Sequence, residues 1–173
     1  MKNYIAVCLF LFLALVLISK MSFAQTQHLI PFNLEDQFQK EHTHKDFVGK
    51  ITILIGSDKG GSKYNGKWAT AIKKAMQDQQ LEIELAPLPV ADVSSAPFFL
   101  HGYVRSRFPQ EKDKWTLLDW EGEFSEAYNF KDNKSNILVF DRNGKMIYQT
   151  SGEEVSGSEV MRILEAVRKA GLK

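Results

Sequence analysis

A group of small, polar and cationic side chains at residues 57–63 is the part of the sequence best suited to binding or chemistry. It follows a short β-branched run, residues 51–55, and precedes apolar positions that recur at helical spacing. Backbone N–H groups at the start of a helix, with lysine side chains beside them, can hold a small anion. The alternative is a solvated loop in which glycine serves only the turn geometry.

Part of this stretch matches the spacing of a phosphate-binding loop, Gly-x-x-x-x-Gly-Lys, through Gly61, Gly66 and Lys67. Trp68 then stands where a nucleotide-binding loop has a Ser or Thr to hold magnesium. We therefore expect no nucleotide binding. A small anion held by the lysines of this stretch is the weaker alternative that remains.

Other candidate groups are less complete. His42 and His44 could point the same way from an extended segment, but a metal site needs three or four ligands. A polar surface turn is the favoured interpretation, and we predict no metal site and no cofactor. The chain has no Gly-x-Ser-x-Gly motif of a serine hydrolase. The run Asp141-Arg-Asn-Gly144 is interpreted as a turn rather than a calcium loop.

The first 24 residues have the three parts of a cleavable signal peptide. Lys2 precedes an apolar run over residues 5–18, and Ser22-Phe-Ala24 places small residues before the expected cleavage point. The apolar run is short for a membrane span, although an uncleaved anchor is the alternative. We expect a single domain over residues 25–173, located in the periplasm or secreted, with no membrane contact after signal cleavage.

The only cysteine, Cys8, lies within this signal segment. The mature chain would then contain no thiol and no disulfide, so thiol oxidoreductase, peroxidase and Cys-ligated metal chemistry are all excluded for it. The full chain carries a net charge of +1, and removal of Lys2 and Lys20, with no acidic residue in that segment, leaves −1. A balanced charge gives no support for nucleic-acid binding.

The mature sequence alternates strand and helix patterns, which predicts an α/β sandwich. The predicted strands are residues 51–55, 81–85 and 115–119, and a hairpin follows at 136–149 around an Asn-Gly turn. The predicted helices are residues 67–79, a short one after Pro97, residues 123–128, and a last one capped by Ser156. Residues 56–66 are predicted to be a loop, and the proline-rich start of residues 86–109 to be irregular.

The segment after Pro97 collects Phe98, Phe99, Tyr103 and Phe108 beside Arg105 and Arg107. Aromatic and arginine side chains are favoured at interfaces. The same side chains could instead cover one edge of the core, and the sequence leaves both interpretations open.

The order of these elements resembles the thioredoxin superfamily, in particular its redoxin and peroxiredoxin-like branches. Three ordered pieces are similar to the YtfJ-like family of exported bacterial proteins. They read Ser-Lys-Tyr-Asn-Gly-Lys-Trp-Ala-Thr-Ala-Ile-Lys at residues 62–73, Asp-Trp-Glu-Gly-Glu-Phe-Ser-Glu-Ala-Tyr at 119–128, and Ser-Asn-Ile-Leu-Val-Phe-Asp-Arg-Asn-Gly-Lys at 135–145. The resemblance implies a thioredoxin-like three-layer sandwich, with a central mixed sheet flanked by helices.

In redox-active relatives, cysteines lie between the first core strand and the following helix, facing a cis-proline before a later strand. Here Lys59 and Ser62 fall near the cysteine positions, and Ser135 or Asn136 stands in place of the proline. The resemblance therefore implies a loop that keeps the position of a redox site without its chemistry. Its candidate binding residues are Ser57, Asp58, Lys59, Gly60, Gly61, Ser62, Lys63 and Ser135.

Two functions follow as hypotheses. One is a redox-inactive binding or adaptor domain that recognises an unknown protein partner through this loop. The other is a non-thiol enzyme or small-anion-binding protein that uses the Gly/Lys loop at the helix N-terminus, with Lys59 as an electrophile.

Overall fold

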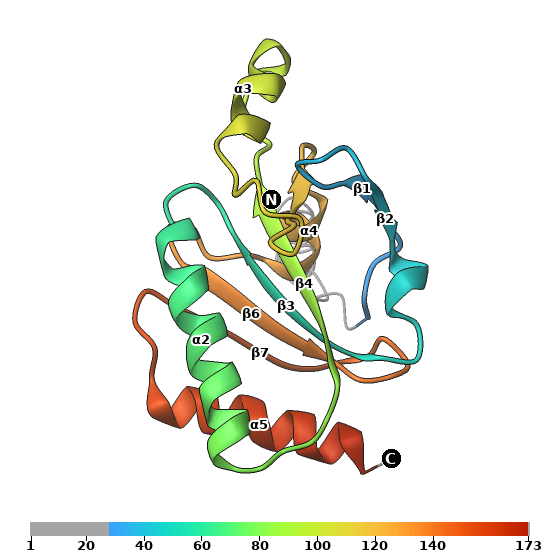
Figure 1. Ribbon diagram of the computed structural model, residues 1–173, viewed down its shortest axis with the longest axis vertical. Helices are drawn as coiled ribbons and strands as arrows, with labels where there is room; N and C mark the ends of the chain where they lie inside the picture. Colours follow the sequence, from blue (N-terminus) through green and yellow to red (C-terminus); the bar gives the residue numbers. More distant parts are fainter. Residues whose placement is uncertain (1–27, 173) are drawn as a thin grey trace, which may run out of the picture.

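A five-stranded mixed sheet forms the centre of the computed structural model, which describes residues 28–172 (Figure 1). Its strands are β3 (Ile51–Ser57), β4 (Leu85–Asp92), β5 (Leu117–Asp119), β6 (Ser135–Phe140) and β7 (Met146–Gly152), in the order β5-β4-β3-β6-β7. The pairs β3/β4 and β4/β5 are parallel, whereas β3/β6 and β6/β7 are antiparallel. This is the mixed sheet predicted from the sequence.

Helices cover both faces of the sheet and produce three layers (Figure 1). Helices α2 (Ser62–Asp78) and α5 (Gly157–Gly171) lie on one face, where Trp68 and Ile72 pack with Ile163 and Val167. Helix α4 (Glu123–Tyr128) lies on the other face and buries its own aromatic side chains there. Because both clusters are built from residues 28–172, a chain that begins at residue 25 retains them.

The predicted loop at residues 56–66 is wrong for most of its length. Strand β3 continues to Ser57 and helix α2 begins at Ser62, so only residues 58–61 connect them. The predicted helix start at residue 67 was too late. The backbone N–H of Ser62 already donates to the carbonyl of Asp58, and Gly66 lies inside the helix with open space around it.

The predicted strand at residues 81–85 is also wrong. Residues 81–84 alternate between half-buried and exposed but pair with no neighbouring strand, and β4 begins only at Leu85. The irregular segment expected after it is the strand itself, in spite of Pro87 and Pro89. Pro87 and Pro89 are two residues apart, so their backbone nitrogens face the same side of the strand. Strand β5 pairs with β4 only from Val90 onward. Their missing N–H groups face a side with no partner strand, so no ladder hydrogen bond is lost.

The remaining predicted elements are confirmed with small changes in length. Strand β5 starts two residues later than expected, α4 matches its predicted bounds, and the β6/β7 hairpin turns at Asp141–Gly144 as predicted. After Pro97, a 3-10 turn (Phe98–Leu100) continues into α3 (His101–Ser106). Ser156 occupies the N-cap position of α5, although its hydroxyl caps no N–H.

A short antiparallel hairpin precedes the sheet and was not expected. It consists of β1 (Asn33–Glu35) and β2 (Glu41–Thr43), followed by a 3-10 turn (His44–Phe47). Its tight connection places Gln39 at a φ of 63°, and Asp36 accepts the N–H groups of Phe38 and Lys40. Within residues 28–172, no helix is long and apolar enough to cross a bilayer. The predicted signal peptide lies outside the described residues.

Candidate functional site

The loop predicted as the binding site lies at the carboxyl end of β3, where the parallel strands β3 and β4 finish side by side. Ser57 pairs with Ala91 in the sheet register, so the loop at 58–61 and the segment after β4 leave the same edge. In Figure 1 this edge carries the N-terminus of α2 and the projecting α3 segment. The topology therefore brings the loop and the aromatic segment to one end of the molecule.

Asp58 holds the loop in place through its carboxylate. It accepts the N–H of Gly61 at 2.7 Å and that of Asn133 at 3.0 and 3.2 Å. Its backbone carbonyl accepts the N–H of Ser62 at 3.1 Å. These bonds join the loop to the segment that precedes β6, and they occupy two of the N–H groups that an anion at this helix end would use.

Gly60 and Gly61 are required by the close approach of that same segment. A Cβ on Gly60 would lie 2.0 Å from the side-chain oxygen of Asn133, and one on Gly61 would lie 2.2 Å from the carbonyl oxygen of Lys134. The sequence analysis assigned these glycines to turn geometry. In the structure they are needed because residues 133 and 134 leave no room for a side chain. The loop lies against residues 133–134, which directly precede β6. The resemblance placed the proline of redox-active relatives before this strand.

A buried polar chain lies beneath the loop. Asn65 of α2 donates from Nδ2 to Ser57 Oγ at 2.9 Å, and Ser135 Oγ donates to Asn65 Oδ1 at 2.7 Å. Ser57 is 2 % exposed and Ser135 is fully buried. An amide cannot act as a general base, so these contacts give neither hydroxyl the activation that a nucleophile requires. Ser57 and Ser135 support the loop from below, and a partner could not touch them.

The side chains that the loop presents to solvent are cationic. Lys59, Ser62 and Lys63 are exposed, while the Ser62 hydroxyl donates to the carbonyl of Lys59 at 2.8 Å. The Lys63 ammonium lies 4.9 Å from the ring centroid of Tyr64, whose hydroxyl donates to Glu153 at 3.1 Å. Of the eight predicted residues, the lysines and Ser62 form the accessible surface, and the others shape or support it.

Two residues of this arrangement were not identified from the sequence. Asn65 was assigned to the loop, and Asn133 was not singled out. Asn136 was named only as a stand-in for the proline. It is buried, and it accepts the N–H of Lys131 while donating to the carbonyls of Lys131, Lys134 and Gly56. From the sequence, an asparagine side chain is expected to form hydrogen bonds, but the sequence does not show with which groups.

The histidine pair does not form a polar surface turn. His42 is buried, and its Nε2 lies 2.9 Å from Asp36 Oδ2 while its ring stacks on Trp115 at 4.4 Å. Burial alone would raise the pKa of Asp36, but hydrogen bonds from His42 and the N–H groups of Lys40 and Phe38 lower it below its usual value. Among residues 28–172 no three His, Cys, Asp or Glu side chains are grouped as metal ligands.

The segment between β4 and β5 packs on the domain through one side only. The His101 ring stacks on Trp120 at 3.6 Å, and Arg105 Nη2 donates to Glu35 at 2.6 Å. The buried Gln37 amide links both ends of the segment's base by donating to Pro109 and Lys114 and accepting from Thr116. Phe98, Phe99 and Tyr103 are exposed and do not cover the core edge, whereas His101 and Arg105 lie against the domain; the interface interpretation stays a prediction.

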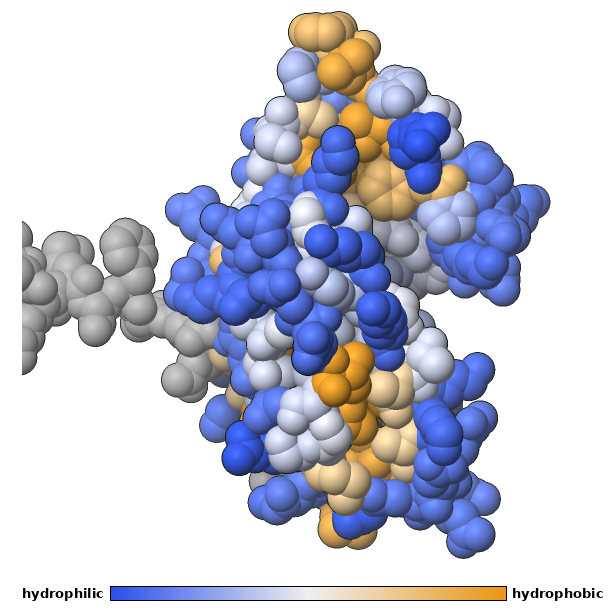
Figure 2. All heavy atoms as spheres, turned by 90° about the vertical axis from the view of Figure 1, so that its left-hand side faces the viewer, coloured by the Kyte–Doolittle hydropathy of each residue, from blue (hydrophilic) through white to orange (hydrophobic). Residues whose placement is uncertain are grey.

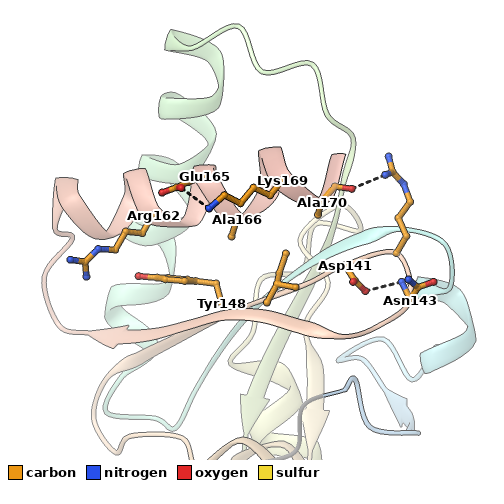
Figure 3. Close-up of a pocket in the computed structure, with 10 residues that line it drawn as sticks. Asp141, Asn143, Tyr148, Arg162, Glu165, Ala166, Lys169 and Ala170 are labelled. Atoms are coloured by element: carbon orange, nitrogen blue, oxygen red, sulfur yellow. Dashed lines mark hydrogen bonds and ion pairs between the residues drawn. The ribbon is translucent and has the colours of Figure 1, made fainter. Parts of the chain in front are cut away.

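A groove of about 530 Å³ lies between β7 and α5, away from the loop (Figure 3). Its lining includes Arg142, Arg162 and Lys169, but each of these cations already has a partner. Arg142 donates to the carbonyl of Ala170, Arg162 pairs with Glu159, and Lys169 pairs with Glu165. The groove is a surface depression whose cationic side chains are already engaged by neighbouring groups of the chain.

Comparison with known proteins identifies the fold. No model of a protein family and no curated protein matches the sequence. Solved structures do match. The exposed lipoprotein thioredoxin Etrx1 of Streptococcus pneumoniae is 16% identical, with 81% of this chain and 99% of that chain covered at a TM-score of 0.58. Yeast Sco1 with copper bound is 19% identical, with 84% and 95% covered at a TM-score of 0.59.

The thioredoxin domain of a thiol-disulfide oxidoreductase from Bacteroides vulgatus is a third similar structure. It is 15% identical, with 82% of this chain and 96% of that chain covered at a TM-score of 0.54. Identities this low establish the architecture alone. The chain has the thioredoxin-like fold, as the sequence resemblance implied.

Proposed function

We propose that this chain is a redox-inactive binding domain of thioredoxin fold that recognises a protein partner through the loop at residues 57–63. The observation that carries the proposal is the state of the loop at the redox position of the fold. It contains no cysteine, it is fixed at both sides through Asp58 and the glycines, and it presents Lys59 and Lys63 to solvent. A fixed cationic surface suits recognition of an acidic partner.

A small-anion site is the second candidate and is less well supported. The carboxylate and carbonyl of Asp58 already accept the N–H groups of Gly61 and Ser62, where an anion would bind. Catalysis by a lysine requires a desolvated amine, and Lys59 is exposed. Copper binding is not part of the proposal, because the described residues provide no group of three metal ligands.

We also propose that the chain is exported after cleavage of residues 1–24 and is related to the YtfJ-like family. The support for both is the sequence: the signal-peptide pattern and the three ordered motif pieces. N-terminal sequencing of the protein recovered from the cell envelope should begin at Gln25. A start at Met1 would contradict cleavage.

Thermal unfolding of the mature chain, residues 25–173, distinguishes the two candidate functions. The chain is screened with inorganic anions, phosphorylated metabolites and divalent metals. A specific ligand at 100 times its dissociation constant stabilises the folded state by about 2.7 kcal/mol. The proposal expects no shift in melting temperature from any of them. A shift that the double substitution Lys59→Ala and Lys63→Ala abolishes would replace the protein-partner proposal with a small-ligand site.

A further inference from the structure

The tip of the segment between β4 and β5 exposes a cluster of large apolar side chains. Phe98 is 85% exposed, Phe99 is 81% exposed and Tyr103 is 63% exposed, with Leu100 beside them at 38%. The tip projects beyond the end of the sheet (Figure 1), and hydrophobic side chains gather there, separated by a mostly hydrophilic band from a second hydrophobic patch lower on the same face (Figure 2). Single exposed apolar residues are common, but a cluster at a projecting end indicates a contact surface.

The opposite side of this segment is fixed to the domain, so the tip has a defined orientation. The stack of His101 on Trp120 and the ion pair of Arg105 with Glu35 hold α3 from beneath. His101 and Arg105 are four residues apart and therefore lie on one helix face. The tip is presented outward by a rigid base.

The outer part of the segment, residues 93–110, contains Arg105 and Arg107 and no acidic residue, whereas Glu111 and Asp113 lie in the part that returns to β5. Arg105 is paired with Glu35, so Arg107 is the cation this part presents to solvent. The exposed Arg107 guanidinium lies 6.0 Å from the ring centroid of Tyr103. Exposed apolar and aromatic side chains with an arginine beside a tyrosine are a combination that a membrane interface favours.

We propose that this tip docks reversibly into the interfacial region of an anionic lipid bilayer. The membrane is favoured over a second copy of the chain because stable protein interfaces use about 20–30 residues from each side. The tip offers four large apolar side chains on a convex end, and a bilayer requires no matching concave surface. The sequence analysis expected no membrane contact after signal cleavage, and this proposal departs from that expectation because Phe98 and Phe99 lie outside the core.

Vesicle co-sedimentation of the mature chain tests the proposal with vesicles of phosphatidylcholine alone and of phosphatidylcholine mixed with phosphatidylglycerol. We expect binding to the mixed vesicles, weaker binding to phosphatidylcholine alone, and a reduction by salt. The double substitution Phe98→Ser and Phe99→Ser should lower the partition coefficient at least about tenfold. The matched control Val48→Ser and Leu172→Ser removes two exposed apolar side chains elsewhere and should leave it unchanged.

A site-specific fluorophore reports which part of the molecule enters the lipid. The mature chain has no cysteine, so a single Gly102→Cys substitution in α3 can carry an environment-sensitive dye. Gly157→Cys, at the start of α5, is the control, and a Cβ meets no atom within 4 Å at either position. Mixed vesicles should blue-shift the dye at position 102 and not the dye at 157.

Three results would overturn the proposal. They are the absence of binding to mixed vesicles, binding that Phe98→Ser and Phe99→Ser do not reduce, and a lipid-free dimer that the same pair of substitutions dissociates in sedimentation velocity. The last result would assign the tip to a second copy of the chain. Lys59 and Lys63 are left intact in all these variants, so failure here is separate from failure of the proposed loop function.

Discussion

At the scale of single residues, hydrogen bonds and close packing hold the candidate loop between β3 and α2. Asp58 anchors the loop to Asn133, and Asn65 connects the buried hydroxyls of Ser57 and Ser135. Buried polar groups of this kind are costly when they lose a partner, so the network favours one loop conformation. The result is a loop held in place on both sides by hydrogen bonds.

Gly61 provides the sharpest test of this packing. In Gly61→Ala the new Cβ would meet the backbone of Lys134 at 2.2 Å, and the loop or the segment before β6 must move. We expect a loss of about 1–3 kcal/mol in the free energy of unfolding, measured by urea denaturation.

Gly66→Ala is the control, since Gly66 lies in the helix that Gly61 precedes and has no atom within 4 Å of its Cβ position. It should stabilise the protein by up to about 1 kcal/mol, because alanine is the better helix former. Equal effects of the two substitutions would contradict the packing role assigned to Gly61.

The position of the candidate loop could be predicted from sequence, but its internal structure could not. The β-branched run before Ser57 and the glycines after it located the loop between a strand and a helix. The hydrogen bond between Asn65 and Ser135 joins residues 70 positions apart, and no local pattern encodes it. The helix start was placed late because Gly66 was interpreted as a loop residue.

At the scale of elements, the parallel register of β3 and β4 determines which end of the sheet carries the candidate loop. It sets Ser57 beside Ala91, so the loop and the aromatic segment emerge together. The sequence misplaced β4 because residues 81–85 alternate and the following prolines are poor strand formers. Only the tertiary pairing, in which Pro87 and Pro89 face a side without a neighbour, makes that strand possible.

Asp119, at the end of β5, is buried just before α4. Its pKa therefore depends on how these two elements pack together. Burial raises its pKa, against hydrogen bonds from the N–H groups of Phe124 and Glu123, and nearby Asp92 raises it further. The folded protein therefore holds this proton to higher pH than the unfolded chain does. The associated stability is complete below the unfolded pKa of about 3.9 and is lost as the pH rises through the folded pKa.

Asp119→Asn removes this titration. Wild type should therefore lose stability relative to the variant as the pH rises from about 4 toward neutral, measured by urea unfolding at several pH values. Asp132→Asn, at an exposed position, is the control for a change of charge alone. A difference between wild type and Asp119→Asn that stays constant with pH would contradict the assignment.

At the scale of the whole molecule, two exposed features share one end of a thioredoxin-like domain. The loop at residues 58–61 and the α3 segment both follow the carboxyl ends of the parallel strands β3 and β4 (Figure 1). Two hydrophobic cores, one on each face of the sheet, stabilise the described part of the chain. This division separates the residues that stabilise the domain from those available for recognition.

The most direct test of the central claim is site-specific photo-crosslinking in cells that produce the full chain. A photoreactive amino acid replaces Lys59 or Lys63 in the loop, and Lys74 at the far end of the same helix serves as the control. The account predicts a discrete protein adduct at positions 59 and 63 that survives reducing conditions, and none at 74. No adduct at the loop, or the same adducts at all three positions, would contradict partner recognition by the loop.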